Sequence, residues 1–190
     1  QQNAKNTEAC EDITCSDGYI QLWPGYCYNE GHLALIASLS GLPAGNDNDK
    51  RNLVDTVSNC VTWTGEDFNG NNSDLKELNC TSNTGDAKWS GSFPETMPDI
   101  STITRFKIAN NNISGQLPDN ALCDMGINEN WYDSPGYFDI RNNLFCPAWP
   151  TCFSATPNTP YYVPATQLNT PADVQASVEQ CCAWGCECPE

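Results

Sequence analysis

The sequence has little positive charge, a single histidine and no long apolar run. Only 8 of its 190 residues are Lys or Arg, against 24 Asp or Glu, and the formal net charge is −16. Such a charge opposes binding to nucleic acid and to anionic membranes, because both attract cationic side chains. No apolar stretch approaches the roughly 20 residues that span a bilayer. We therefore expect no nucleic-acid partner and no membrane span.

The scarcity of histidine limits the chemistry that the chain can perform. A serine or cysteine nucleophile commonly needs a histidine base, and no Gly-x-Ser-x-Gly motif accompanies His32. Acidic pairs of the glycosidase kind are harder to exclude, but none stands in a recognisable frame. The acidic run 46–49 lacks the glycine and the distal glutamate of a calcium loop, which favours a solvated turn. We expect a non-enzymatic protein without cofactor or metal, in which His32 is a partly buried structural residue, and a hydrolase is the weaker alternative.

Cysteine, by contrast, is abundant. Twelve cysteines, an even number, are typical of an oxidising compartment in which thiols pair as disulfides. The sequence does not contain the two CxxC motifs that typically form a zinc site. A metal site is therefore the weaker interpretation of the cysteines, including the cluster after residue 180. We expect six disulfides, whose pairing the spacing leaves open. Their members are Cys10, Cys15, Cys27, Cys60, Cys80, Cys123, Cys146, Cys152, Cys181, Cys182, Cys186 and Cys188.

Other features favour the same compartment. N-glycosylation sequons begin at Asn71, Asn79 and Asn112. The first residue is Gln1 and no signal-type apolar stretch follows it, so we expect the mature product of signal cleavage. The sequence thus predicts a secreted glycoprotein, extracellular or at the cell surface.

Changes in composition divide the chain into five parts. We expect a Cys-rich extension ordered by its disulfides rather than by a core, a helical cap containing a helix at 32–39 and a weaker helical turn near Leu53, a repeat region, an extended Thr/Pro segment, and a Cys-rich knot. These parts are 1–30, 31–62, 63–152, 153–172 and 173–190.

The repeat region carries an internal pattern. Residues 100–118 follow the frame LxxLxxLxLxxNxLSGxLP without a gap. In this frame Phe106 and Ile108 point inward from a strand, and Asn111 is a buried amide that satisfies backbone groups of neighbouring turns. Parts of the frame recur upstream, from Leu75 to Pro94, and downstream, from Phe138 to Pro147, with an insertion on each side.

Residues 31–152 resemble the extracellular leucine-rich-repeat family of plants, algae and protists. The resemblance is carried by the LSGxLP match at 113–118, by Cys60-Val-Thr-Trp63-Thr-Gly65, and by the end at 143–150. It implies an α/β repeat fold: a short right-handed solenoid with parallel strands on its concave face, disulfide-capped ends and irregular Cys-rich extensions. For the caps we expect Cys60 to pair with Cys80, and Cys123 to pair with Cys146 or Cys152.

The frame also predicts which side chains face outward on the concave sheet. Four of the eight basic residues fall there, which suits an acidic partner. The equally weighted alternative is that these charges serve only solubility. The expected binding residues are Lys76, Glu77, Arg105, Lys107, Tyr137, Asp139 and Arg141. Asn79, Thr81, Thr104 and Ala109 are expected on the same face.

The Thr/Pro segment predicts an extended backbone with O-linked glycans as an option. Its apolar strip of Tyr161, Tyr162, Val163 and Leu168 is expected to dock on its own domain or on a neighbouring molecule. We therefore expect a non-catalytic interaction protein that assembles with other copies of itself, or with another extracellular protein, into an extracellular fibre. The alternative is a soluble recognition module, like a wall-enzyme inhibitor or receptor ectodomain, that binds a protein or an acidic glycan on the concave face.

Overall fold

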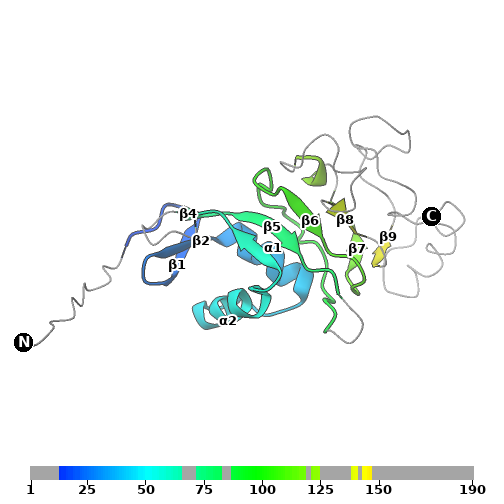
Figure 1. The fold of residues 1–190 in the computed structure, drawn as a ribbon, viewed down its shortest axis with the longest axis horizontal. Coiled ribbons are helices and arrows are strands. Elements are labelled where there is room, and N and C mark those ends of the chain that lie inside the picture. The colour runs from blue at the N-terminus through cyan, green and yellow to red at the C-terminus, as the bar shows by residue number, and fades with distance from the viewer. Residues whose placement is uncertain are drawn as a thin grey trace, which may run out of the picture.

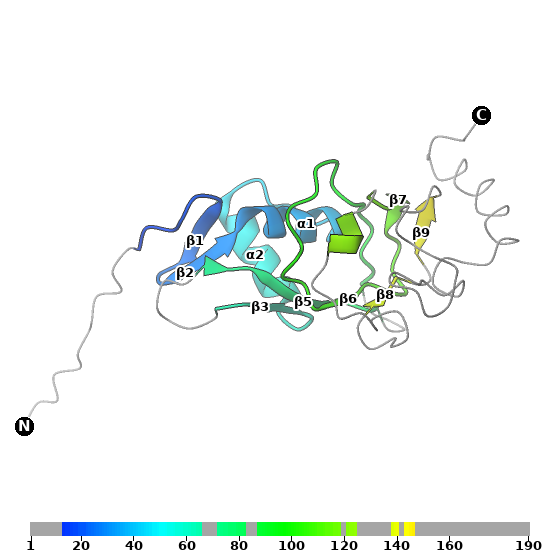
Figure 2. The same cartoon turned by 90° about the horizontal axis from the view of Figure 1, so that it is seen from above.

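The computed structural model describes residues 13–65, 72–82, 87–118, 121–124, 138–140 and 143–146. Within these residues, two α-helices, one 3-10 helix and nine short strands lie along an elongated body, with β1 and β2 toward one end and β9 toward the other (Figures 1 and 2). The elements are β1 (Tyr19–Trp23), β2 (Tyr26–Asn29), α1 (Glu30–Ser40), α2 (Asp47–Val57), β3 (Val61–Trp63), β4 (Asn72–Ser73), β5 (Leu75–Asn79), β6 (Arg105–Lys107), β7 (Ser114–Gln116), the 3-10 helix η1 (Ala121–Asp124), β8 (Phe138–Asp139) and β9 (Leu144–Cys146).

The strands form three small sheets. The first has the order β1-β2-β4, the second β3-β5-β6-β8, and the third pairs β7 with β9. The first two sheets are mixed, because β1–β2 and β3–β5 are antiparallel whereas β2–β4, β5–β6 and β6–β8 are parallel. The third pair is parallel.

The solenoid expected from the sequence is wrong. In a solenoid, similar coils stack on one another and their strands pair in parallel. The described residues instead form small sheets, two of them mixed, and two α-helices that are consecutive in the chain. Residues 61–63, at the expected boundary between the helical cap and the repeats, form a strand antiparallel to β5. The physical reason is that an apolar frame determines which side chains point inward within a segment, but not which strand that segment pairs with.

Helix α1 confirms the expected helix at 32–39 and is slightly longer. The Asn29 side chain caps its first turn by accepting a hydrogen bond from the His32 N–H at 3.1 Å. Gly41 closes it with a φ of 75°, a left-handed conformation that glycine adopts readily.

Helix α2 corrects two expectations. It spans 11 residues, more than the single weak turn predicted near Leu53, and its first turn occupies the acidic run taken for a solvated turn. The Asn46 side chain accepts a hydrogen bond from the Asp49 N–H at 3.0 Å. Asp47 and Asp49 stabilise the positive N-terminal end of the helix dipole. The acidic run is therefore a helix N-terminus.

The N-terminal segment also differs from its prediction. A disulfide joins Cys27 of β2 to Cys15, which precedes β1, but the β1–β2 hairpin contributes to the core as well. Leu22 is 1% exposed, and the Tyr28 ring meets the Trp63 ring edge-on with centroids 5.1 Å apart. Apolar burial and a disulfide thus act together where a disulfide alone was expected.

A ladder of aromatic rings forms the core beneath the second sheet. Phe106 stacks between Phe93 and Phe138 with centroid distances of 6.2 and 6.1 Å, and Phe145 lies 5.9 Å from Phe93. Phe106 and Phe138 are completely buried. The predicted inward orientation of Phe106 and Ile108 is confirmed, since neither has exposed surface.

The segment at Gly91 joins this core to helix α1. The Gly91 N–H donates to the Leu39 carbonyl at 3.1 Å, and the Ser92 N–H donates to the Ser38 carbonyl at 3.0 Å. A Cβ on Gly91 would lie 1.6 Å from that Ser38 carbonyl oxygen. Only a residue without a side chain permits this approach.

Candidate functional site

Several of the residues predicted to bind a partner lie on strands β5 and β6 of the second sheet. Strand β5 pairs with β6 so that Glu77 is opposite Arg105 and Asn79 is opposite Lys107. Successive side chains of a strand point to opposite faces. Leu78, between these residues, is completely buried, so its neighbours project from the other side. Lys76 does not follow this alternation, because the register of β3 and β5 shifts at this residue, but its side chain is exposed. We call the set Glu77, Asn79, Arg105 and Lys107, together with Lys76, the β5–β6 face.

An ion pair occupies part of this face. Arg105 Nη1 donates to Glu77 Oε2 at 3.2 Å, and the two side chains are 34% and 28% exposed. Such partial exposure leaves the pair partly screened by solvent. Lys107 is half-buried and Lys76 is exposed. No salt bridge of either lysine is found within the described residues.

Other members of the predicted face lie differently. Asp139 is in register with Lys107 but only 4% exposed, and Ala109 is 1% exposed, so neither has the expected outward surface. Thr104 is exposed, as expected. Tyr137 and Arg141 lie outside the described residues. Lys76 is exposed whereas Arg105 and Lys107 are half-buried, and the frame does not foresee the burial at the edge of the sheet.

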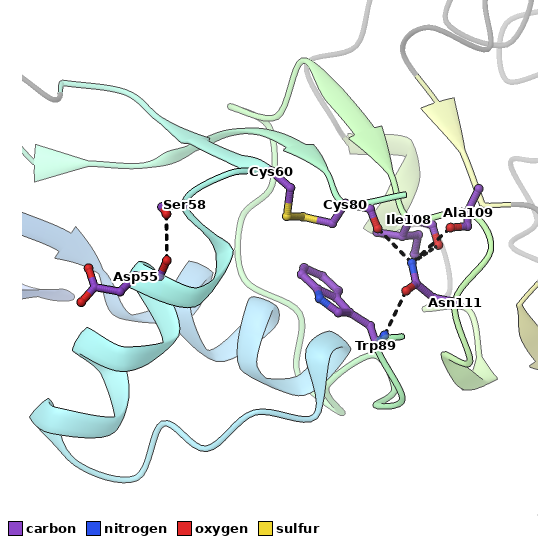
Figure 3. The surroundings of a disulfide bond; sticks show 8 residues. All are labelled: Asp55, Ser58, Cys60, Cys80, Trp89, Ile108, Ala109 and Asn111. Atoms are coloured by element: carbon purple, nitrogen blue, oxygen red, sulfur yellow. Dashed lines mark hydrogen bonds between the residues drawn. A yellow bond between two sulfur atoms is a disulfide. The ribbon is translucent and has the colours of Figure 1, made fainter. Parts of the chain in front are cut away.

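The predicted disulfide between Cys60 and Cys80 is confirmed and borders the site (Figure 3). Beside it, the Asn111 amide donates to the carbonyls of Cys80 and Ile108, both at 2.9 Å, and of Ala109 at 3.2 Å. Asn111 Oδ1 accepts from the Trp89 N–H at 2.9 Å. This confirms the predicted buried amide, which fixes the end of β5 relative to the turn after β6.

Asn143 repeats this arrangement one strand further along. Its amide donates to the Ile108 carbonyl at 2.8 Å and to the Ile140 carbonyl at 3.1 Å, and its oxygen accepts from the Ile113 N–H at 3.1 Å. The two asparagines therefore hold β5, β6 and β8 in a fixed register, so the β5–β6 face has a rigid support.

A pocket of about 350 Å³ opens on the side of the disulfide where the Trp89 ring lies (Figure 3). It is lined by the C-terminal part of α2, by both cysteines and by residues 81–82 and 87–89. Among the described residues the Thr81 hydroxyl, which is buried, has no hydrogen-bond partner. Among its described lining residues there is no carboxylate, histidine or free thiol.

His32 is structural, as predicted, although it is more buried than expected at 1% exposure. Its Nδ1 accepts from the Leu75 N–H at 3.0 Å, and its Nε2 lies 2.6 Å from the Asp99 carbonyl. Both nitrogens are satisfied by a neutral ring whose proton is on Nε2. The imidazole therefore joins α1 to β5 and is not free to act as a base.

Two groups near His32 have shifted pKa values. Burial raises the pKa of Tyr19, and its hydrogen bond to the Asp74 carboxylate at 2.8 Å acts in the same direction. The Ser101 N–H, which donates to Asp99 Oδ1 at 2.9 Å, lowers the pKa of Asp99. These shifts follow from structural hydrogen bonds, and no catalytic arrangement accompanies them within the described ranges.

Several sequence predictions lie outside the described residues. These are the tail strip of Tyr161, Tyr162, Val163 and Leu168, the sequon at Asn71, Cys10, the four cysteines after residue 180, and the pairing of Cys123, Cys146 and Cys152. Asn79 and Asn112 are exposed. In the part of the chain that the structure describes, no three residues are grouped as a metal site, and no helix is long and apolar enough to cross a membrane.

No family model, no curated protein and no solved structure matches the chain.

Proposed function

We propose that the chain is a non-catalytic extracellular protein that associates with other copies of itself, and that the β5–β6 face of one copy contacts an acidic surface of the next. The observation that carries the proposal is the register of β5 and β6. Lys107 lies near Arg105 on β6, and the exposed Lys76 lies on β5, in a chain whose net charge is −16. A cationic patch on an acidic body complements most of the surface of another copy.

Helix α2 offers one acidic surface of this kind. Asp47 and Asp55 are exposed, and Asp49 is half-buried. A contact between the β5–β6 face and α2 joins two different surfaces, so it generates a ring or an open filament rather than a closed dimer. This geometry agrees with a fibre-forming protein, and the two disulfides agree with an oxidising extracellular compartment.

The charge balance predicts how the association depends on salt. Two copies of net charge −16 repel each other at long range, whereas the lysines act at contact. At about 0.15 M salt the Debye length is about 8 Å, so the long-range repulsion is screened while contact pairs survive. Association should therefore be strongest at intermediate salt and weaken toward about 1 M, where the Debye length is about 3 Å.

Sedimentation equilibrium of three proteins tests this proposal. The double variant Lys76→Glu/Lys107→Glu reverses the unpaired charges and leaves the Glu77–Arg105 pair intact. Lys88→Glu, at an exposed position outside both α2 and the β5–β6 face, is the control for a change of charge. The average mass should rise with concentration for the wild type and for Lys88→Glu, but stay that of a monomer for the double variant.

A monomeric wild type at every concentration contradicts self-association. In that case, the same double variant should be examined with a uronic-acid oligosaccharide. Binding to the wild type that is lost in the double variant would favour the recognition-module alternative.

A further inference from the structure

One glycosylation sequon contains a disulfide-bonded cysteine. Asn79, Cys80 and Thr81 form the sequon, and Cys80 is bonded to Cys60 across 20 residues of sequence. The Asn79 side chain is exposed, but the Thr81 hydroxyl is buried. The acceptor group is therefore accessible, while the hydroxyl that defines the sequon is not.

The backbone of the sequon is also occupied. The Asn79 N–H donates to the Cys60 carbonyl at 2.7 Å, and the Cys80 N–H donates to the Lys107 carbonyl at 2.7 Å. An enzyme that recognises the sequon has to reach its asparagine and its hydroxyl together, which is why used sequons lie in accessible loops. The folded, disulfide-bonded segment does not offer both groups at once.

We propose that formation of the Cys60–Cys80 disulfide and N-glycosylation of Asn79 compete, and that the chain which forms the disulfide first keeps Asn79 unmodified. This inference rests on the export of the chain proposed above. The disulfide holds Cys80 beside β3, which keeps the sequon within the sheet and the Thr81 hydroxyl buried. Before it forms, the sequon is part of an open chain.

The two reactions consume different groups of the same tripeptide. Glycosylation joins the Asn79 amide nitrogen to the anomeric carbon of an oligosaccharide carried on a lipid diphosphate. The bond from that carbon to the diphosphate oxygen breaks, the lipid diphosphate leaves, and the amide loses a proton. Disulfide formation oxidises the thiols of Cys60 and Cys80, whose two electrons and two protons reduce an external disulfide to two thiols.

The outcome of the competition determines the state of the β5–β6 face. Asn79 lies opposite Lys107 in register, and their side chains share one side of the sheet. A glycan on Asn79 would cover the lysine proposed to contact the next copy. Early disulfide formation therefore yields a bare, association-competent face, whereas early glycosylation yields a covered one.

Glycan occupancy measured by mass spectrometry of the total chain, cell-associated and secreted, tests the inference. Cys60→Ser removes the disulfide without altering the sequon. Cys15→Ser is the matched control, because it removes the other described disulfide. The sequon of Asn112 contains no cysteine and serves as an internal reference.

We expect low occupancy of Asn79 in the wild type and a rise of several fold in Cys60→Ser, with Asn112 unchanged and no such rise in Cys15→Ser. A pulse of reductant during synthesis of the wild type should give the same rise. High occupancy of Asn79 in the disulfide-bonded wild type, or an equal rise in both cysteine variants, overturns the inference. If Asn112 is glycosylated but the occupancy of Asn79 does not change in Cys60→Ser, the inference fails while the proposed export stands. If no sequon is glycosylated in any variant, both the inference and the proposed export are contradicted.

Discussion

Glu77 and Arg105 lie directly opposite each other on strands β5 and β6, and their side chains form an ion pair at 3.2 Å. The pair sits at the centre of a patch that the sequence presents as a cationic strip. Because Arg105 is already paired, Lys76 and Lys107 become the groups most available to a partner. The structure thus changes which residues should be tested.

The Glu77–Arg105 pair should contribute little to stability. Each side chain is about a third exposed, and pairs of this kind are worth less than about 1 kcal/mol. A double-mutant cycle with Glu77→Gln and Arg105→Gln, followed by denaturant unfolding, measures the coupling energy. A coupling well above this value that persists in high salt would contradict the solvent-screened pair described above.

Asn111→Ala should destabilise the protein by about 3 kcal/mol, because it leaves the Trp89 N–H and several buried carbonyls without their partner. Asn52→Ala, at an exposed position of α2, is the control and should change stability by less than about 0.5 kcal/mol. Chemical denaturation of both variants makes the comparison. Equal effects would mean that the buried amide does not hold the strands together.

Gly91→Ala should cost about 3 kcal/mol or more, because the added methyl group collides with backbone of α1 that cannot move without breaking its own hydrogen bonds. Gly45→Ala makes the same change where the nearest atom would be the Asp49 Oδ2 at 3.7 Å. Thermal unfolding should show a large loss for the first variant and almost none for the second. A tolerated Gly91→Ala would contradict the packing of this segment on α1.

Asp99 should make a small contribution to the free energy of unfolding near neutral pH, and this contribution should be lost in acid. Its folded pKa lies below the usual value of 3.8, so it stabilises the fold above that pH and loses this effect as the pH falls through the folded pKa. Asp99→Asn should therefore be slightly less stable than the wild type near neutral pH, with the difference vanishing in acid. Melting temperatures across this range provide the measurement, and a difference that grows on acidification would reverse the assigned sign.

Local features of this protein could be predicted from sequence, whereas the pairing of its strands could not. The inward positions of Phe106 and Ile108 and the buried Asn111 follow from an apolar period and a polar residue within it. The Cys60–Cys80 disulfide was expected because of the family resemblance. The antiparallel pairing of β3 with β5 depends on contacts distant in sequence, which no local pattern specifies.

The candidate site shows the same limit. The outward alternation of Arg105 and Lys107 could be predicted from the strand period. The coincidence of the Asn79 sequon with a disulfide follows from the predicted Cys60–Cys80 pairing, because Cys80 is the middle residue of that sequon. The burial of Asp139 and of the Thr81 hydroxyl could not be predicted, because both depend on how neighbouring segments pack.

Hydrogen–deuterium exchange of dilute and concentrated protein tests the central claim most directly. If copies associate through the β5–β6 face, concentration should slow exchange in residues 75–79 and 105–107, and the Lys76→Glu/Lys107→Glu variant should show no such change. Slowed exchange confined to other segments, or equal slowing in the variant, would contradict the account.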